Sequence, residues 1–154
     1  MLQIDPIDFI EQFDTLMVSS ISSKLKPHSS YAPFVSQDKL YYICISKMAK
    51  HTTNLLKTPA ASIMFIQDES ESKNSFSRKR VTFDVNVLNI ERDKEKFLEI
   101  MKLFNEKFGE RASMYEQMAD FYLFEFTPLS GRAVFGFGEA YKYKNEEFLP
   151  LMGS

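Results

Sequence analysis

The sequence has little of the chemistry that builds disulfides or metal clusters. Its 154 residues include one cysteine and two histidines. The single thiol, Cys44, cannot form a disulfide within the chain, which is typical of proteins from a reducing cytosol. His28 and His51 are far apart in sequence, and no cysteine or carboxylate cluster accompanies either at ligand spacing. Neither a zinc site nor a cysteine nucleophile is therefore predicted.

Long apolar runs and a dominant charge are also missing. No window approaches the roughly 18 apolar residues of a membrane-spanning helix, and the first residues lack the basic start and apolar stretch of a signal peptide. With a net charge of −2, we expect neither nucleic acid nor a membrane as partner. The composition predicts a soluble cytoplasmic protein with one domain over residues 1–154, because 44% hydrophobic residues suffice for one core.

The hydrophobic patterns predict an α+β fold dominated by antiparallel strands. Strands are expected over 18–23, 31–34, 39–45, 61–67, 78–90, 120–126 and 132–143, with turns at 26–28 and 128–131. Helices are expected after an N-cap at Asp5, over 46–58, over 93–108 with a stop at Gly109, and over 112–118. Because the helices interrupt hairpins and do not follow every strand, the pattern favours a small barrel with helices packed outside.

Cationic and polar side chains gather in the segment SKMAKHTTNLL, residues 46–56. Ser46 is expected to be the N-cap of a helix. The side chains expected to face the core are Met48, Leu55 and Leu56, opposite a polar stripe formed by Lys47, Lys50 or His51, and Asn54. Cations in a first helical turn oppose the helix dipole, so Lys47 and Lys50 are expected to hold a phosphate or carboxylate. The alternative is that both lysines are solvated and His51 is exposed.

Two arginines, Arg78 and Arg80, share the polar face of the strand predicted over 78–90. Their planar guanidinium forks suit phosphate or carboxylate, so we predict an anion site shared with the 46–56 segment. The alternative is a strand edge kept soluble by its charges. Gly136 and Gly138 predict a strand bulge and not a dinucleotide-binding turn, which needs a third glycine between a strand and a helix.

Five motifs together resemble haem-utilisation proteins of the FMN-binding split-barrel superfamily, related to pyridoxamine 5′-phosphate oxidase. In chain order they are SSYAPF (29–34), SKMAKHTTNL (46–55), SRKRVTF (77–83), ADFYLFEF (119–126) and GRAVFGFGEA (131–140). The resemblance implies a six-stranded antiparallel split β-barrel with flanking helices. It also implies a homodimer whose ligand sites lie in two clefts at the dimer interface.

The same resemblance implies which residues bind the cofactor, haem or FMN. They are Ser46, Lys50, His51, Thr52, Asn54, Arg78, Arg80 and Asp120, and the charge pattern adds Lys47. Haem-binding relatives commonly supply the iron with a histidine from a C-terminal tail or an extra domain, whereas no histidine follows His51 here. We therefore predict His51 as the leading internal candidate for an iron ligand.

Three functions stay open at this point. The first is a haem-binding protein of iron acquisition, with or without haem breakdown. The second is an FMN-dependent oxidoreductase, and the third is a non-catalytic haem or flavin binding module. In each case the protein chiefly binds and orients a cofactor, whose own chemistry does the work. No catalytic residue is assigned.

Overall fold

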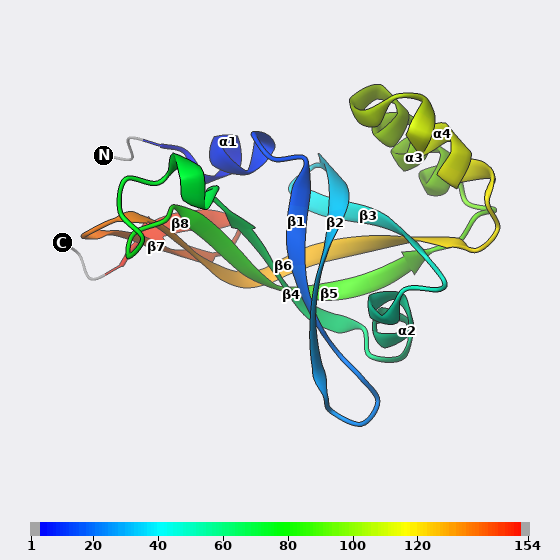
Figure 1. The fold of residues 1–154 in the computed structure, drawn as a ribbon, viewed down its shortest axis with the longest axis horizontal. Helices are drawn as coiled ribbons and strands as arrows, with labels where there is room; N and C mark the ends of the chain where they lie inside the picture. The colour runs from blue at the N-terminus through cyan, green and yellow to red at the C-terminus, as the bar shows by residue number, and fades with distance from the viewer. Residues whose placement is uncertain (1–3, 152–154) are drawn as a thin grey trace.

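The chain alternates helices with long strands in the computed structural model, which describes residues 4–151 (Figure 1). The first half contains α1 (Pro6–Glu11), β1 (Thr15–Ile21), β2 (Pro27–Gln37), β3 (Leu40–Ser46), α2 (Lys50–Lys57), β4 (Ala60–Ile66) and the short 3₁₀ helix η1 (Glu69–Glu71). The second half contains β5 (Arg80–Ile90), α3 (Glu95–Phe108), α4 (Glu110–Gln117), β6 (Phe121–Gly136), β7 (Glu139–Lys144) and β8 (Glu147–Pro150). Within residues 4–151, no helix is long and apolar enough to cross a membrane.

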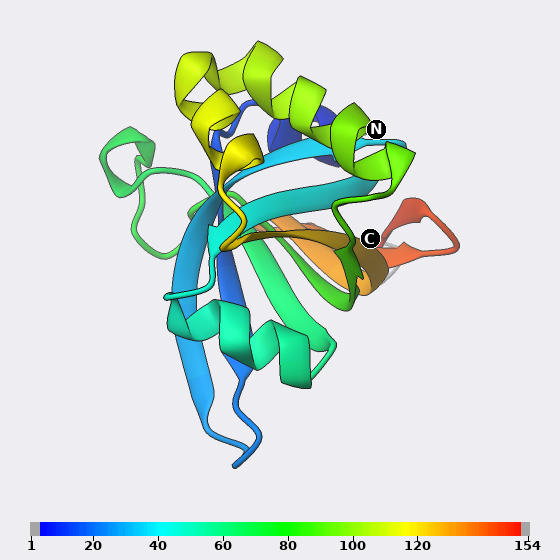
Figure 2. The ribbon, with the colours of Figure 1, turned by 90° about the vertical axis from the view of Figure 1, so that its right-hand side faces the viewer.

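Antiparallel pairing closes six of these strands into a barrel. The strand order is β3-β2-β1-β4-β5-β6, and β6 pairs back with β3 from Tyr41 opposite Phe126 to Ser46 opposite Phe121. β7 and β8 continue the sheet from the second half of β6. The structure therefore confirms the predicted six-stranded antiparallel barrel with flanking helices. Figure 2 shows α3 and α4 on one side of this barrel and α2 on the other.

Aromatic rings fill the inside of the barrel. Phe34, Tyr41, Phe65 and Phe83 are each at most 1% exposed. The ring centroid of Phe65 lies 5.1 Å from that of Phe34 and 5.3 Å from that of Tyr41. Edge-on and tilted contacts of this kind add to the stabilisation from burial itself. Strand alternation sends these rings inward, and their neighbours along the chain point outward.

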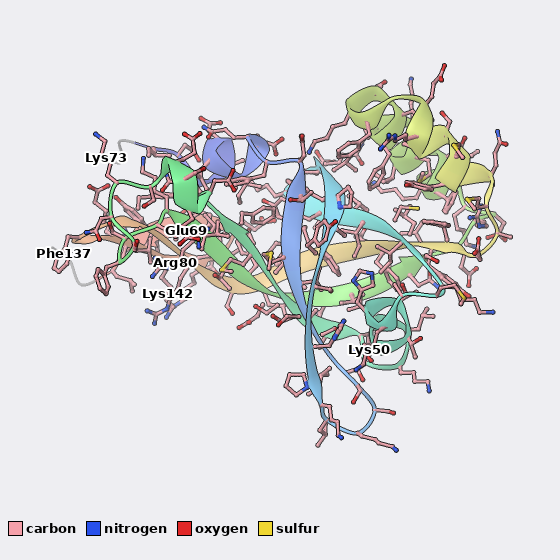
Figure 3. All side chains as sticks on the ribbon, viewed as in Figure 1. Lys50, Glu69, Lys73, Arg80, Phe137 and Lys142 are labelled. Atoms are coloured by element: carbon pink, nitrogen blue, oxygen red, sulfur yellow. The ribbon has the colours of Figure 1, made fainter. Side chains whose placement is uncertain are left out.

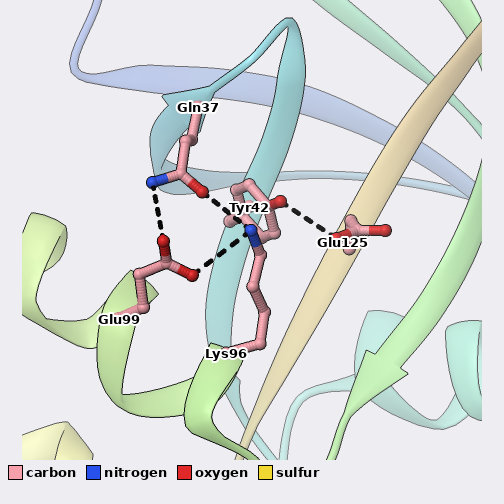
Figure 4. A network of polar contacts seen from close by, with 5 residues as sticks. All are labelled: Gln37, Tyr42, Lys96, Glu99 and Glu125. Atoms are coloured by element: carbon pink, nitrogen blue, oxygen red, sulfur yellow. Dashed lines mark hydrogen bonds and ion pairs between the residues drawn. The ribbon is translucent and has the colours of Figure 1, made fainter.

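A second apolar layer lies outside the barrel, under α3. Its members from the helix are Phe97, Ile100, Met101 and Phe104, and its members from the barrel wall include Val35, Tyr42 and Cys44. Polar contacts at the edge of this layer connect the helix to the strands (Figure 4). The Lys96 Nζ donates to Gln37 Oε1 at 2.7 Å and lies 3.4 Å from Glu99 Oε2, and the Tyr42 hydroxyl donates to Glu125 Oε2 at 2.9 Å. Apolar burial and these contacts together hold α3 against the barrel.

The turn predicted at residues 26–28 lies earlier in the chain. Backbone bonding closes the hairpin between Ser22 and Lys26, whose amide and carbonyl are 2.9 Å apart, and Leu25 takes the positive φ of 62° that the turn needs. Pro27 and His28 belong to β2, where they pair with Ile21 and Ser20. The prediction was wrong because proline is compatible with the first residue of a strand.

The turn predicted at 128–131 does not form either. β6 runs without interruption over Phe121–Gly136, and its register against β5 shifts between Asp84 and Val85, beside Pro128. Proline has no amide hydrogen to donate, so it fits at such an irregularity in the ladder. A second register shift lies between Val134 and Gly136, which confirms the bulge predicted at Gly136. Gly138, with a φ of 74°, instead lies in the turn that divides the strand predicted over 132–143 into β6 and β7. The Asp5 N-cap and the stop at Gly109 are also confirmed.

Replacing Phe65 by alanine is expected to lower the free energy of unfolding by about 3–5 kcal/mol, because a fully buried ring leaves a cavity among other rings. The matched control is Phe76→Ala, since that ring is 96% exposed and its removal should change stability by less than about 0.5 kcal/mol. Urea unfolding followed by circular dichroism measures both. Equal losses in the two variants would contradict the placement of Phe65 in the core.

Candidate functional site

The segment that begins at Ser46 leaves the barrel as a turn before it becomes a helix. Ser46 is the last residue of β3, its Oγ accepts from the Met48 amide at 3.1 Å, and α2 begins only at Lys50. The predicted N-cap at Ser46 is therefore wrong, and Ala49 occupies that position. The physical reason is strand pairing, because Ser46 lies opposite Phe121 and the next amide, of Lys47, donates to the Asp120 carbonyl at 2.6 Å.

Three polar side chains of α2 face inward, contrary to the prediction, whereas Leu55 is buried and Lys50 exposed as predicted. His51, Thr52 and Asn54 are at most 8% exposed, whereas Met48 and Leu56 are 87% and 42% exposed. Hydroxyl groups on β1 and β2 explain this orientation. The Asn54 Nδ2 donates to Ser20 Oγ at 3.1 Å, and the Thr52 hydroxyl donates to the Ser46 carbonyl at 2.5 Å. Buried polar groups with such partners carry little desolvation penalty.

His51 is held by one ring nitrogen. Its Nδ1 lies 2.7 Å from Ser30 Oγ, and the Ser30 hydroxyl lies 3.5 Å from the Val18 carbonyl, to which it donates. In the tautomer in which Nδ1 donates to this hydroxyl, the lone pair lies on Nε2. Among residues 4–151, no group forms a hydrogen bond with Nε2. In the same residues, every fully buried side-chain nitrogen has a hydrogen-bond partner, so Nε2 is not fully buried. Nε2 is thus accessible.

Electrostatics keeps this imidazole neutral. Burial lowers the pKa of His51 below its usual value, and the nearby charge of His28 lowers it further. His28 was predicted to lie in a turn, but it belongs to β2, two residues before Ser30, and so lies on the side of the strand that faces α2. A neutral imidazole is the form that binds a metal.

A cavity of about 640 Å³ opens beside His51. We name it the His51 cavity. Its walls are mainly aromatic, formed by Tyr31, Phe104, Phe108, Tyr115 and Phe121, and its polar groups include Ser46, His51 and Arg111. A cavity of this size, largely apolar with a few polar groups, is typical of small-molecule sites. Cys44 also lines it, and burial raises the pKa of that thiol to about 12, so it stays protonated at neutral pH.

Arg92 holds one wall of the His51 cavity in place. Its guanidinium donates to the carbonyls of Glu116 and Phe121, at 2.6 and 3.0 Å, and to that of Met118. The bonds to Glu116 and Met118 satisfy carbonyls at the end of α4, which a helix end otherwise leaves without partners. Together with the bond to the Phe121 carbonyl, they also fix Tyr115 against Phe121, whose rings stack with centroids 4.6 Å apart. No local motif marks Arg92, since its partners are all more than twenty residues away.

The remaining predicted residues lie in different places. Lys47, Lys50 and Asp120 are exposed, and Lys47 and Asp120 are joined by their backbones. Arg78 precedes β5, and its Nε and Nη2 both donate to the Gln67 carbonyl, at 3.0 and 2.6 Å. That guanidinium therefore closes the loop between β4 and β5.

Arg78 and Arg80 do not join the His51 cavity within one chain. Each lines another hollow, and Figure 3 shows Arg80 at the opposite end of the barrel from Lys50. The predicted anion site shared by α2 and these arginines is wrong for a single chain. The order of the strands explains the separation, because α2 packs at one end of the sheet and β5 begins at the other.

The family follows from comparison with known proteins. The family model described as pyridoxamine 5′-phosphate oxidase matches residues 7–135. The chain therefore belongs to the pyridoxamine 5′-phosphate oxidase family, and the predicted split barrel is the fold of this family's solved structures.

Within this family the chain is similar to haem-utilisation proteins. It is 38% identical over 145 residues to the heme oxygenase HutZ of Vibrio cholerae serotype O1, a match that covers 94% of this chain and 82% of the relative. A crystal structure of HutZ from Vibrio cholerae, described as a heme storage protein, superposes with a TM-score of 0.83 at 36% identity, over 88% of this chain and 98% of that one. ChuZ of Campylobacter jejuni superposes with a TM-score of 0.86 at 32% identity, over 94% of this chain and 60% of that one. The resemblance read from the five motifs is confirmed.

Stability is expected to fall as the pH drops from about 7.5 to about 5.5. The pKa of His51 is lower in the folded state than its unfolded value near 6.5, so the unfolded chain binds the proton more readily and gains population below that pH. His51→Gln keeps a hydrogen-bonding side chain without the titration and should flatten this dependence. Urea midpoints across the pH range measure it, and an equal slope in both proteins would contradict a buried neutral His51.

Proposed function

We propose that this chain is a haem-binding protein of iron acquisition and that haem binds at the His51 cavity. The observation that carries the proposal is a buried histidine, neutral by its pKa shift, whose Nδ1 is fixed by Ser30 while Nε2 stays available beside aromatic walls. Metal-binding histidines usually donate their second ring nitrogen in this way, which orients the ring. The heme-related descriptions of HutZ, its relative, support the proposal.

Apart from Arg78 and Arg80, which line other hollows, each predicted residue then has a role in or near this site. Nε2 of His51 would hold the iron, and the aromatic walls would cover the apolar porphyrin. Arg111 lines the same cavity and offers a cation to a carboxylate of the ligand. Ser46 borders the cavity, whereas Thr52 and Asn54 position α2 through their bonds to Ser46 and Ser20. Lys47, Lys50 and Asp120 remain proposed site residues at the exposed rim. When bound, haem supplies the redox and oxygen chemistry of its iron.

Haemin titration is expected to give a sharp, shifted main absorption band in the wild type. His51→Ala should weaken binding by about tenfold or more and broaden the band, because the imidazole ligand is lost. His28→Ala is the matched control, since it removes the only other histidine of the sequence and leaves Ser30 and His51 in place.

Two results would contradict this assignment. Identical spectra and affinities in the wild type and His51→Ala would remove His51 as the ligand. Paired near-ultraviolet and blue absorption of the purified protein, with no haemin binding above background, would instead support the FMN-dependent alternative.

We further propose that the protein is a cytoplasmic homodimer. Met17 lies opposite Tyr31 on β2 and opposite Met64 on β4, so the three side chains share the outer face of the barrel. Met17 and Tyr31 are 41% and 65% exposed. Adjacent large apolar side chains on an outer sheet face are typical of a protein interface. A second copy of the chain is the occupant that the family resemblance implies.

Sedimentation at micromolar concentration is expected to report twice the chain mass of 17.9 kDa. Tyr31→Glu places a charge on the proposed interface and should shift the protein toward the monomer, because an unpaired charge opposes burial. Leu98→Glu is the control, since Leu98 is 61% exposed on α3 and does not belong to the face formed by β1, β2 and β4. A monomeric wild type would contradict the dimer.

A further inference from the structure

Three cations share the outer face of β5, β6 and β7. Arg132 of β6 lies directly opposite Thr82 of β5 and Lys142 of β7. Arg80 is two residues before Thr82, so it points to the same side of the sheet. Figure 3 shows Arg80 and Lys142 at the same end of the barrel, away from Lys50 and α2. The cations therefore form one group that is distinct from the His51 cavity.

These residues line a hollow of about 540 Å³, which we name the basic hollow. Thr82 and Ser130 add hydroxyl groups to its lining, and Asp84 adds one carboxylate. The Asp84 carboxylate accepts from the Ser130 hydroxyl at 3.2 Å. Three cations thus face a single carboxylate, and the hollow keeps an excess of positive charge.

The fold itself does not neutralise these charges. Among residues 4–151, none of the three cations forms an ion pair. Like charges directly opposite each other on neighbouring strands destabilise a sheet, and Arg132 and Lys142 are such a pair. One nitrogen of Arg80 donates to the Arg78 carbonyl at 2.9 Å, which orients the guanidinium and leaves its other hydrogens available. This arrangement has a cost in stability that a bound anion would offset.

We infer that the basic hollow binds an oxyanion, the phosphate or carboxylate group of a small molecule. Two guanidinium forks and one ammonium can donate to several oxygens of one such group. Two sources present this chemistry: a phosphate compound in solution, and the propionate carboxylates of a haem held by a second copy of the chain. The second source rests on the proposed function, because it requires haem to be bound at the His51 cavity. The hollow and this cavity lie at opposite ends of one barrel, so the haem would belong to a second copy of the chain.

The first arm of the test uses pyrophosphate and no haem. Thermal unfolding is followed as pyrophosphate is added at constant ionic strength, and the wild type should gain in midpoint temperature with added ligand. The double variant Arg132→Gln and Lys142→Gln should bind about tenfold more weakly or worse. Lys144→Gln is the matched control, since it removes one charge from the same strand outside the hollow.

The double variant also has a signature without ligand. Because it removes opposed like charges, it should unfold at the same temperature as the wild type or higher. A structural role for these residues predicts the reverse. A lower midpoint in the absence of any anion would therefore count against the inference.

The second arm compares haemin with its dimethyl ester, in which both carboxylates are masked. If the propionates occupy the hollow, the wild type should bind haemin more tightly than the ester, and the double variant should lose that preference while keeping the absorption band that depends on His51. If the protein binds no haemin, the proposed function fails, and the pyrophosphate titration alone tests whether the basic hollow binds an oxyanion. The inference is overturned if the double variant matches Lys144→Gln in both arms.

Discussion

Pairing between β3 and β6 is the interaction on which the rest of this structure depends. It joins residues about eighty positions apart, from Tyr41 and Phe126 to Ser46 and Phe121, and so turns a twisted sheet into a closed barrel. Closure buries β3 on both sides, because Tyr41, Ile43 and Ile45 face the barrel interior while neighbouring residues face α3. One strand thus belongs to two cores. The same pairing brings the end of β3 to the start of β6 and so positions the walls of the His51 cavity.

Hydrogen bonds determine how α2 sits on this barrel. A helix usually turns its apolar stripe inward, yet in α2 Leu56 is 42% exposed, while His51, Thr52 and Asn54 are buried beside Leu55. Two serines make this orientation favourable: the Ser20 hydroxyl accepts a hydrogen bond from Asn54, and the Ser30 hydroxyl forms one with Nδ1 of His51. The consequence for chemistry is direct, because burial favours the neutral form of His51 and the bond to Ser30 engages Nδ1 and not Nε2.

Charge is divided between the two ends of the barrel. The end with α2 carries the His51 cavity, with aromatic walls and one arginine, while the other end carries the cations of the basic hollow. A ligand with an apolar body and anionic groups has chemistry that suits both ends. Two chains placed antiparallel could bring one end of each beside the other end of its partner, which gives the proposed dimer a functional reason beyond burial of its outer face.

Much of this fold could be predicted from local patterns. Alternation identified β5, helical periodicity identified α3, and single residues marked the N-cap at Asp5, the stop at Gly109 and the bulge at Gly136. Five short motifs also identified the family. These features depend on neighbours in sequence, where propensity and spacing act directly. Ser46 and His51, which line the His51 cavity, were selected as candidate site residues from the same short segment.

Long-range contacts decided the rest. Pro27 and Pro128 looked like turn residues, but strand pairing placed both in the sheet. The face of α2 was predicted from apolar spacing, whereas serines from β1 and β2 determined it. Arg78 donates to the Gln67 carbonyl and so closes a loop. Arg92 supports a wall of the His51 cavity by donating to a carbonyl of α4, and no sequence pattern connects the two. The sequence by itself determined elements such as β5 and α3, since those depend on adjacent residues. Only the tertiary structure decided which side chains meet, because a hydrogen bond needs its distant partner in place.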